Sequence, residues 1–340
     1  MKSYKLTGLR RFDMLDVPQP EIERDSDVLV RMQRVGVCGS DIHYYTDGKI
    51  GSQLVQYPWA IGHEGAGTVV ATGSRVTEFK PGDRVTFDPA KSCGECGQCR
   101  QGRPHTCEKL QFLGCPGQIE GCLSEYMVFD QRRCLHVPEG LSLDEAAFAE
   151  PLSIALYGAS LYPSMKGASV GVLGCGPIGL CALQVALAHG AARVSVTDKL
   201  DSRLKAARTF GAHWAGLPSQ FIDRLENAQL DVVFECCGQQ DAMDQAVRIL
   251  KPGGELSLIG IPEANRVSFD INLLRRKELR IQNVRRQNDA MGRALGMIES
   301  GSVNARAMIT HRFPFAHTPE AFDLVANYAD GVIKAMIYFD

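Results

Sequence analysis

The sequence lacks an excess of charge of either sign and lacks a long hydrophobic run. Its 37 Lys and Arg residues almost balance its 39 Asp and Glu residues, which leaves a formal net charge of −2. A chain without a basic excess gives no reason to expect a nucleic acid or an anionic membrane as its partner. Uninterrupted apolar stretches of about 18 residues are absent, so we expect no membrane-spanning helix.

A dense disulfide scaffold is excluded as well, because the chain has only 12 cysteines in 340 residues. The first residues, MKSYKLTGLR, contain no apolar core of a signal peptide, and we therefore expect a protein of the reducing cytoplasm. The cysteines outside the motifs described below are expected to be small core residues rather than reactive thiols. They are Cys115, Cys122, Cys134, Cys175, Cys181, Cys236 and Cys237.

Internal repeats, low-complexity tracts and long linkers are also absent from the sequence. Hydrophobic residues make up 45% of the chain and charged residues 22%, which is the composition of a globular protein. A chain of 340 residues is too long for one ordinary hydrophobic core. Two domains are therefore expected.

The first part of the chain has the pattern of strands separated by turns. Stretches such as 27–37 (DVLVRMQRVGV) and 67–74 (GTVVATGS) carry β-branched residues and are bounded by Gly, Pro and Asp. After Pro151 the pattern changes, because an apolar stretch at 168–174 is followed by a helical pattern at 177–190 and another apolar stretch. Short apolar strands that alternate with longer helices predict βαβ units and a parallel sheet.

Together these patterns predict an α/β protein with an inserted domain. We expect a doubly wound parallel-sheet domain over residues 152–284. A β-rich domain is expected to comprise residues 1–151 and 285–340, since mixed helix and strand patterns return near the end of the chain.

Four cysteines near residue 100 have the spacing of a metal site. Cys93, Cys96, Cys99 and Cys107 stand in the run CGECGQCRQGRPHTC, within a lobe of residues 91–110. Gaps of two residues let the chain fold back on one ion, so four thiolates can surround a tetrahedral zinc. Disulfides could use the same residues, but the short gaps favour a structural zinc.

A glycine-rich turn follows the apolar stretch 168–174. Gly174, Gly176 and Gly179 form the pattern G-C-G-P-I-G, in which Pro177 and Ile178 open the next helix. This pattern is typical of a dinucleotide site, because the glycines permit a tight turn, close approach of a pyrophosphate and close packing of helix on strand. The alternative is a glycine turn in a fold that binds no nucleotide.

Asp198 ends the next predicted strand, about 20 residues beyond the glycine turn. A carboxylate there can accept hydrogen bonds from both ribose hydroxyls and would repel a 2′-phosphate, which favours NAD over NADP. Lys199 and Arg203 lie nearby in the sequence and could accommodate a phosphate, so they weaken this preference.

Cys38 and His63 are the candidates for a second metal site. Each follows a predicted strand and stands beside glycines, in GVCGSD and GHEGAG, and Glu64 follows His63 directly. Thiolate and imidazole are good zinc ligands, and Glu150 in FAEPLS is a candidate third protein ligand. Asp41 could hold the free nitrogen of His63 and fix its tautomer. Taken alone, a buried cysteine and a core histidine are more often structural, and the alternative for Glu150 is a carboxylate at a helix N-terminus.

Zinc beside a nicotinamide predicts the oxidation of an alcohol. A bound zinc makes a substrate hydroxyl acidic, and the nicotinamide accepts a hydride from the carbon that carries it. The proton must leave, and Ser40 could pass it on to His43 near solvent, because a histidine titrates in the required range.

The chain resembles the zinc-dependent medium-chain dehydrogenases over nearly its whole length. The GHE motif of residues 62–64, with Gly67, Gly73 and Val76 after it, is similar to the zinc signature of that family, and the four-cysteine lobe is similar to its structural lobe. Within the family, the segment 38–51 (CGSDIHYYTDGKIG) and Glu150 in AEPLS resemble the polyol branch of sorbitol, L-iditol and xylitol dehydrogenases.

The resemblance implies a GroES-like catalytic domain, an inserted Rossmann domain, and a homotetramer or homodimer. It implies that Cys38 and His63 bind the catalytic zinc, with Glu64 and Glu150 as ligands directly, through water or by exchange. Ser40 and His43 match the proton-relay positions of the family. The residues that match positions near the substrate are Tyr44, Phe112 and Arg286.

The sequence departs from the polyol branch in two places. Gln287 and Asn288 follow Arg286 where an aromatic residue is usual, and Cys115 stands where a threonine is common in the animal enzymes. Both departures leave the identity of the polyol open.

The sequence therefore predicts an NAD-dependent enzyme, with two zinc ions per subunit, that oxidises a secondary hydroxyl of a polyol to a ketose. An alternative keeps the same machinery and acts on L-threonine, a sugar acid or a simple secondary alcohol. A further alternative is a zinc- and nucleotide-binding module without turnover.

Overall fold

The computed structural model describes residues 1–225 and 229–339, and the chain forms two compact units. Unit 1 comprises Met1–Glu150, Met291–Glu299 and Ala305–Asp340, and unit 2 comprises Pro151–Ala290 and Ser300–Asn304. The predicted α/β fold class, with a β-rich part and a doubly wound part, is confirmed. The domain limits inferred from the sequence stay a prediction.

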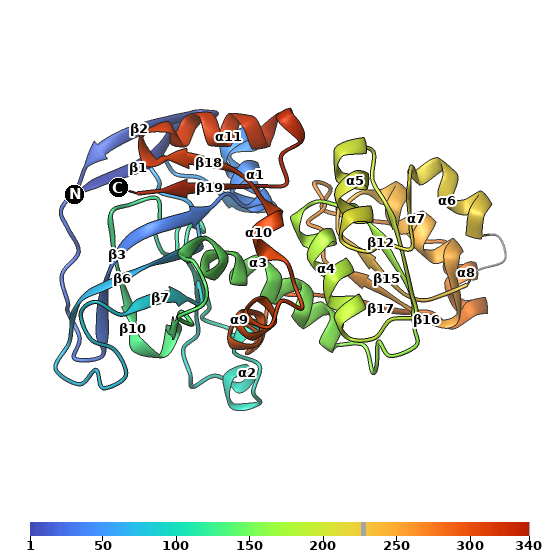
Figure 1. The fold of residues 1–340 in the computed structure, drawn as a ribbon, viewed down its shortest axis with the longest axis horizontal. Helices are drawn as coiled ribbons and strands as arrows, with labels where there is room; N and C mark the ends of the chain where they lie inside the picture. Colours follow the sequence, from blue (N-terminus) through green and yellow to red (C-terminus); the bar gives the residue numbers. More distant parts are fainter. Residues whose placement is uncertain (226–228, 340) are drawn as a thin grey trace. The chain divides into compact units, whose positions relative to one another are not determined.

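Unit 1 is built on a seven-stranded sheet in which β3 (Asp27–Gly36) is central (Figure 1). The strands follow the order β11-β7-β6-β3-β19-β18, and β10 pairs with β3 as well. Val28, Val30 and Met32 of β3 are fully buried, as expected for alternate residues that face a core. The other strands of this sheet are β6 (Glu64–Thr72), β7 (Arg84–Phe87), β10 (Tyr126–Asp130), β11 (Cys134–His136), β18 (Ile309–Pro314) and β19 (Lys334–Tyr338).

Two-stranded sheets and helices complete unit 1. The pairs are β1 (Lys2–Gly8) with β2 (Arg11–Asp16), β4 (Lys49–Ile50) with β5 (Gln53–Leu54), and β8 (Ala90–Lys91) with β9 (Gln111–Phe112). The helices are α1 (Gly39–Asp47), α2 (Gly97–Arg100), η1 (Pro104–Thr106), η2 (Gln131–Arg133), α9 (Met291–Glu299), α10 (Ala305–Met308), η3 (Phe315–His317), α11 (Thr318–Ala326) and η4 (Ala329–Gly331). Helix α3 (Leu143–Ser160) begins in unit 1 and ends in unit 2.

An aromatic cluster joins the hairpin β1–β2 of unit 1 to two helices. The ring of Phe12 stacks on Tyr45 of α1 at a centroid distance of 5.4 Å and meets Phe322 of α11 edge-on at 4.8 Å. The Tyr45 hydroxyl donates to Asp323 at 2.8 Å, so the polar tip of this buried ring is satisfied. These contacts hold α1, which carries several candidate site residues, against the core.

Unit 2 contains a six-stranded sheet in which every pair is parallel. The spatial order β14-β13-β12-β15-β16-β17 corresponds to the third, second, first, fourth, fifth and sixth strands along the chain, which is the doubly wound arrangement. From β12 the first strands are added toward one edge of the sheet, and from β15 the later strands are added toward the other edge. Folds of this kind bind ligands at the place between β12 and β15 where the order changes. The strands are β12 (Ser169–Leu173), β13 (Arg193–Thr197), β14 (Trp214–Gly216), β15 (Leu230–Glu235), β16 (Leu250–Leu258) and β17 (Arg280–Asn283).

The crossover helices of unit 2 cover this sheet. They are α4 (Pro177–Ala188), α5 (Asp201–Thr209), α6 (Pro218–Leu225), α7 (Gln240–Ile249) and α8 (Ile271–Lys277). Helix α4 is apolar nearly all round, and its residues from Gly179 to Ala186 are all buried. Such a helix belongs to the interior of its unit, which explains why the sequence after the glycine turn has little polar character.

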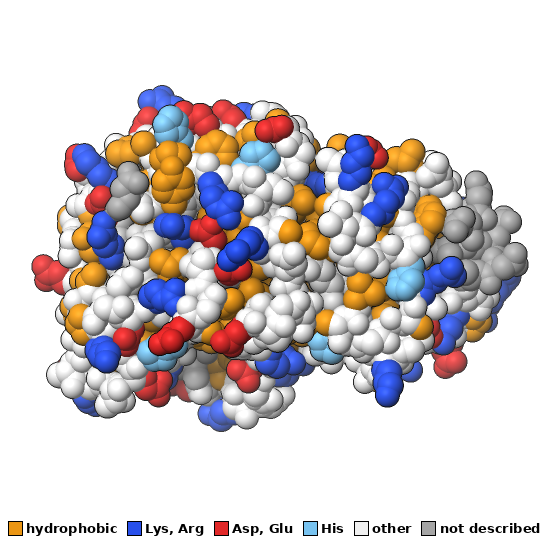
Figure 2. Space-filling view, viewed as in Figure 1, with side chains coloured by type: hydrophobic (Ala, Val, Ile, Leu, Met, Phe, Trp, Pro, Cys, Tyr) orange, Lys and Arg blue, Asp and Glu red, His pale blue; other side chains and the backbone are white. Residues whose placement is uncertain are grey.

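In the part of the chain that the structure describes, no helix is both long and apolar enough to cross a membrane. On the face drawn in Figure 2, basic and acidic side chains are interspersed among polar and hydrophobic ones. This distribution agrees with the near balance of charge in the sequence.

Candidate functional site

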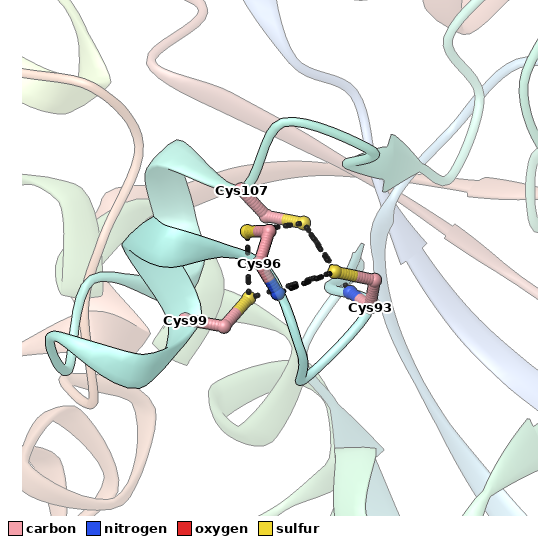
Figure 3. A group of neighbouring side chains, drawn as sticks. All are labelled: Cys93, Cys96, Cys99 and Cys107. Carbon is pink, nitrogen blue, oxygen red and sulfur yellow. Dashed lines mark hydrogen bonds between the residues drawn. The ribbon is translucent and has the colours of Figure 1, made fainter.

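The four cysteines of the lobe in unit 1 point their sulfur atoms toward one another (Figure 3). The Sγ–Sγ distances are 3.4 Å between Cys93 and Cys107, 3.5 Å between Cys96 and Cys99, 3.8 Å between Cys96 and Cys107, and 4.0 Å between Cys93 and Cys99. A tetrahedral zinc with Zn–S bonds of about 2.3 Å requires sulfur atoms about 3.8 Å apart. The four thiols therefore fit a structural zinc.

Backbone amides favour the thiolate form of these cysteines. The amides of Cys93 and Lys109 donate to Cys107 Sγ at 3.3 and 3.4 Å, and the amide of Cys96 donates to Cys93 Sγ at 3.4 Å. Backbone hydrogen bonds lower the pKa of Cys96 to about 6, whereas desolvation and its sulfur neighbours raise the pKa of Cys99 to about 11. Ligation by zinc requires deprotonated thiols, and the amides of the lobe support that state.

The glycine turn of unit 2 lies at the carboxyl end of β12 and opens α4. Gly174 has a φ of 92°, and its amide donates to Thr197 O at 2.9 Å, which joins the turn to the end of β13. A Cβ at Gly179 would overlap the carbonyl oxygen of Gly174, so only glycine lets the helix approach the turn this closely. Gly176 is the N-cap of α4, with Pro177 and Ile178 as its first residues, and the amides of this helix end are available to a pyrophosphate.

Asp198 follows β13 and holds the turn from the other side. Its carboxylate is buried and accepts hydrogen bonds from the amide of Cys175 at 2.7 Å and from that of Leu200 at 2.8 Å. The guanidinium Nη1 of Arg203 lies 3.8 Å from an Asp198 oxygen and 3.8 Å from the place that a Cβ on Gly176 would take. The structure thus brings Asp198 and Arg203 together at the glycine turn.

Glu235 is a residue of this region that the sequence analysis missed. It ends β15, is fully buried, and its Oε1 accepts hydrogen bonds from the amides of Cys237 at 2.8 Å and Gly238 at 2.7 Å. The Cys237 side chain in turn lies against Gly174, where a Cβ would meet it at 2.8 Å. Glu235 therefore fixes the loop that packs beside the glycine turn. The signal in the sequence was a charged residue at the end of an apolar stretch, a place where charged residues are uncommon.

The second cluster of potential metal ligands lies in unit 1. Cys38 precedes α1, His63 precedes β6, and Glu64 begins β6, and one ligand atom of each lies within 4.8 Å of the other two. His63 and Glu64 are buried. A thiolate, an imidazole and a carboxylate form a donor set that fits zinc with a position left open.

Asp41 orients this cluster from α1. Its Oδ1 lies 3.4 Å from His63 Nδ1 and accepts from the amide of Gly62 at 3.2 Å, and its Oδ2 accepts from the amide of Cys38 at 3.3 Å. Burial lowers the pKa of His63, but the charges of Asp41 and Cys38 outweigh burial and raise it well above the usual value. An Asp41 carboxylate at Nδ1 leaves Nε2 for a metal, as the sequence suggested.

Ser40 and His43 lie on the same helix. The Ser40 hydroxyl is 3.4 Å from Cys38 Sγ, so it lies beside a potential metal ligand. His43 is partly exposed, and its Nδ1 lies 3.4 Å from the carboxylate of Asp47. The structure thus places one candidate relay residue at the cluster and the other toward solvent.

Lys334 is the second residue that the sequence analysis missed. It begins β19, is 2% exposed, and its Nζ donates to both carboxylate oxygens of Glu64, at 2.8 and 2.6 Å, and to Val37 O at 3.0 Å. Burial alone would lower the pKa of Lys334, but the Glu64 carboxylate outweighs it and the pKa is raised. A lysine between apolar residues in the predicted strand GVIKAMIYF was the only signal.

Glu150 lies on α3 and is buried. It is not part of the group formed by Cys38, His63 and Glu64, although it interacts electrostatically with His63 and Glu64. Burial raises its pKa to about 7, an effect that His63 opposes and Glu64 increases. The structure thus places Glu150 beside the potential metal ligands, as a carboxyl group whose pKa burial raises to about 7.

The residues expected near the substrate belong to both units. Tyr44 and Phe112 lie in unit 1, where the Phe112 ring contacts the His63 ring at a centroid distance of 5.2 Å. Arg286 lies in unit 2, after β17, with a φ of 55°. The substrate role of all three residues stays a prediction.

Two family models match the chain. The alcohol dehydrogenase GroES-like domain matches residues 24–139, and the zinc-binding dehydrogenase model matches residues 177–300. The first match contains Cys38, His63, Glu64 and the four-cysteine lobe, and the second contains the glycine turn. The fold and both sites thus define a zinc-binding dehydrogenase.

Similar proteins indicate which branch of the zinc-binding dehydrogenases the chain belongs to. The chain is 33% identical to a sorbitol dehydrogenase from Bacillus subtilis (strain 168), over 99% of this chain and 97% of that protein. It is 33% identical to D-xylulose reductase A from Aspergillus oryzae, over 94% and 92%. A solved zinc-binding dehydrogenase from Sinorhizobium meliloti 1021 bound to NADP has a TM-score of 0.90 and 29% identity, over 99% of this chain and 98% of that chain. The protein belongs to the zinc-dependent medium-chain dehydrogenases, in their polyol branch, and the predicted family is confirmed.

The zinc content of the four-cysteine lobe can be tested by substitution. Cys96→Ser removes one of four converging sulfur atoms, so we expect the protein to lose about one zinc per chain and to unfold at a lower temperature. Zinc content and thermal unfolding measure both effects. Cys237→Ser, which changes an exposed cysteine outside the lobe, should leave the zinc content unchanged. A Cys96→Ser protein with full zinc content would contradict the assignment.

The contribution of the buried ion pair between Lys334 and Glu64 to stability can also be tested. Lys334→Met leaves the Glu64 carboxylate buried without its cation, and we expect a loss of about 3–5 kcal/mol in the free energy of unfolding. Urea unfolding of the metal-free protein measures it. Lys205→Met removes a surface ion pair with Asp201 as a control and should cost less than about 1 kcal/mol. Equal losses of unfolding free energy in the two variants would show that the buried pair stabilises the protein no more than a surface pair does.

Proposed function

We propose that the protein oxidises a secondary hydroxyl of a polyol to a ketose and transfers the hydride to NAD. The observation that carries the proposal is the cluster of Cys38, His63 and Glu64, with Ser40 beside it, in a chain whose relatives include proteins named sorbitol dehydrogenase and D-xylulose reductase. A polyol offers several hydroxyl oxygens, and the polar residues around this cluster suit such a substrate.

In this proposal Cys38, His63 and Glu64 hold a catalytic zinc, which supplies a Lewis acid that lowers the pKa of the substrate hydroxyl, while the nicotinamide supplies the hydride acceptor. Ser40 accepts the hydroxyl proton at its Oγ and gives up its own hydroxyl proton toward His43, which releases one proton to solvent. Asp41 keeps His63 in the required tautomer. Glu150 donates or accepts a hydrogen bond beside the ligands rather than serving as a permanent ligand.

The lobe of four cysteines holds a second, structural zinc, so we propose two zinc ions per chain. A homodimer or homotetramer and a cytoplasmic location remain part of the proposal. The edge strand β17 of the parallel sheet, with largely exposed or half-buried residues, supports self-association, because unpaired strand edges favour pairing with another chain.

Zinc content and a substrate panel test the proposed activity. We expect about two zinc ions per chain, since each of the two clusters offers a complete donor set. Initial rates with sorbitol, xylitol, L-threonine, a galactonate and 2,3-butanediol, followed by NADH absorbance, should be highest with a polyol. A protein that binds zinc and NAD but turns over none of these compounds would indicate the module without turnover, and a preference for L-threonine or the sugar acid would replace the polyol.

Cys38→Ser provides the matching variant for the catalytic site. Because Cys38 lies outside the four-cysteine lobe, we expect this protein to fold, to keep the structural zinc, and to lose the catalytic zinc together with turnover. Zinc content, thermal unfolding and NADH production measure the three properties. Full turnover by Cys38→Ser would contradict the proposed ligand.

Asp198 is proposed to select NAD over NADP, because its buried carboxylate lies where a 2′-phosphate would approach. Asp198→Ala should raise the KM for NAD and bring the kcat/KM values for NAD and NADP closer together. Arg203 and Lys199 remain in this variant to attract a phosphate. If the unmodified protein already prefers NADP, as the NADP-bound relative allows, the assignment is wrong.

A further inference from the structure

Gln53 presents a polar side chain to the residues of the candidate catalytic site in unit 1. It begins β5 and pairs with Ile50 of β4, so a tight hairpin through Gly51 and Ser52 returns the chain toward α1. The hydroxyl of Tyr44, on α1, donates to Gln53 Oε1 at 3.2 Å. The hairpin therefore places the Gln53 amide against the helix that also carries Ser40.

The same tyrosine hydroxyl contacts Cys115, in the segment that lies beside a potential metal ligand. Tyr44 Oη lies 3.6 Å from Cys115 Sγ, and both residues are buried. Cys115 follows Phe112, whose ring packs on the imidazole of His63. Gln53 is thus joined through one hydroxyl to the segment that contacts a potential zinc ligand.

The order of donors and acceptors leaves the amide nitrogen of Gln53 available. A thiol is a weak donor and a phenol both donates and accepts, so the Cys115 thiol can donate to Tyr44 while Tyr44 donates to the Gln53 carbonyl. Hydrogen bonds arranged in one direction polarise and strengthen one another, which fixes the amide orientation. Among residues 1–225 and 229–339, the half-buried Gln53 side chain has no partner for Nε2, which carries two N–H donors.

We propose that Gln53 is a specificity-determining residue whose Nε2 donates to a substrate oxygen other than the reacting one. This inference rests on the polyol activity proposed above. Gln53 would recognise a hydroxyl of the polyol that does not react. A neutral amide donor suits hydroxyl oxygens without requiring a negative charge. A simple secondary alcohol has no further oxygen to accept this hydrogen bond, so it gains nothing from Gln53.

Two variants test the inference. Gln53→Leu removes the whole amide, and Gln53→Glu keeps an oxygen that can accept from Tyr44 but lacks the N–H donors. For whichever of sorbitol and xylitol the unmodified protein oxidises faster, kcat/KM should fall by about threefold to tenfold in both variants, the effect of one neutral hydrogen bond. With 2-butanol, kcat/KM should stay within about twofold, since the lost bond is not made to this substrate.

Gln56→Leu is the matched control, because Gln56 is exposed just after the same hairpin. Zinc content, NADH binding by fluorescence and thermal unfolding should remain unchanged in all three variants. If the unmodified protein oxidises polyols but the ratio of polyol to 2-butanol kcat/KM does not fall in both Gln53 variants, the inference alone is overturned. A similar fall in Gln56→Leu also overturns it. Absence of polyol turnover in the unmodified protein overturns the inference together with the proposed function.

Discussion

The candidate catalytic site depends on the balance of buried charge. Asp41, Glu64 and Glu150 are 1%, 1% and 3% exposed, and Cys38 would add a thiolate on binding a metal. Acidic groups in such a place are stable only when they are paired, hydrogen-bonded or neutralised. Lys334 supplies a buried positive charge to Glu64, and a zinc among the ligands would supply the rest. The zinc-binding family of the protein and the excess of buried acidic groups at this site therefore both favour a zinc ion here.

The sheet of unit 1 determines which residue can provide that positive charge. Strand β3 lies between β6 and β19, and its last residue, Gly36, pairs with Glu64 on one side and Met336 on the other. Lys334 and Glu64 meet across the end of β3, and a Cβ at Gly36 would overlap the Glu64 carboxylate. The ion pair is thus a consequence of strand order combined with one residue that has no side chain.

This dependence explains what could be predicted from the sequence. The four cysteines of the lobe are close together in the sequence, and the short gaps between them predict that they converge on one ion. The glycine turn is local as well, because strand, turn and helix are consecutive. Lys334 lies 270 positions from Glu64, and only the pairing of β19 with β3 brings them together. Glu235 and Gln53 were missed for a related reason, since their roles come from hydrogen bonds that no residue spacing specifies.

The two carboxyl groups beside His63 were left with open roles by the sequence, and their surroundings separate them. Both oxygens of Glu64 face the Lys334 ammonium, which supports a charged carboxylate, and one of its oxygens lies within the ligand group. Glu150 lies outside that group, and burial raises its pKa to about 7. Neighbouring carboxyl groups in unlike environments take different tasks. A charged group suits metal ligation, whereas a group that is partly protonated near neutral pH can donate a hydrogen bond to a water or a hydroxyl. This difference supports Glu64 as the ligand and Glu150 as its neighbour.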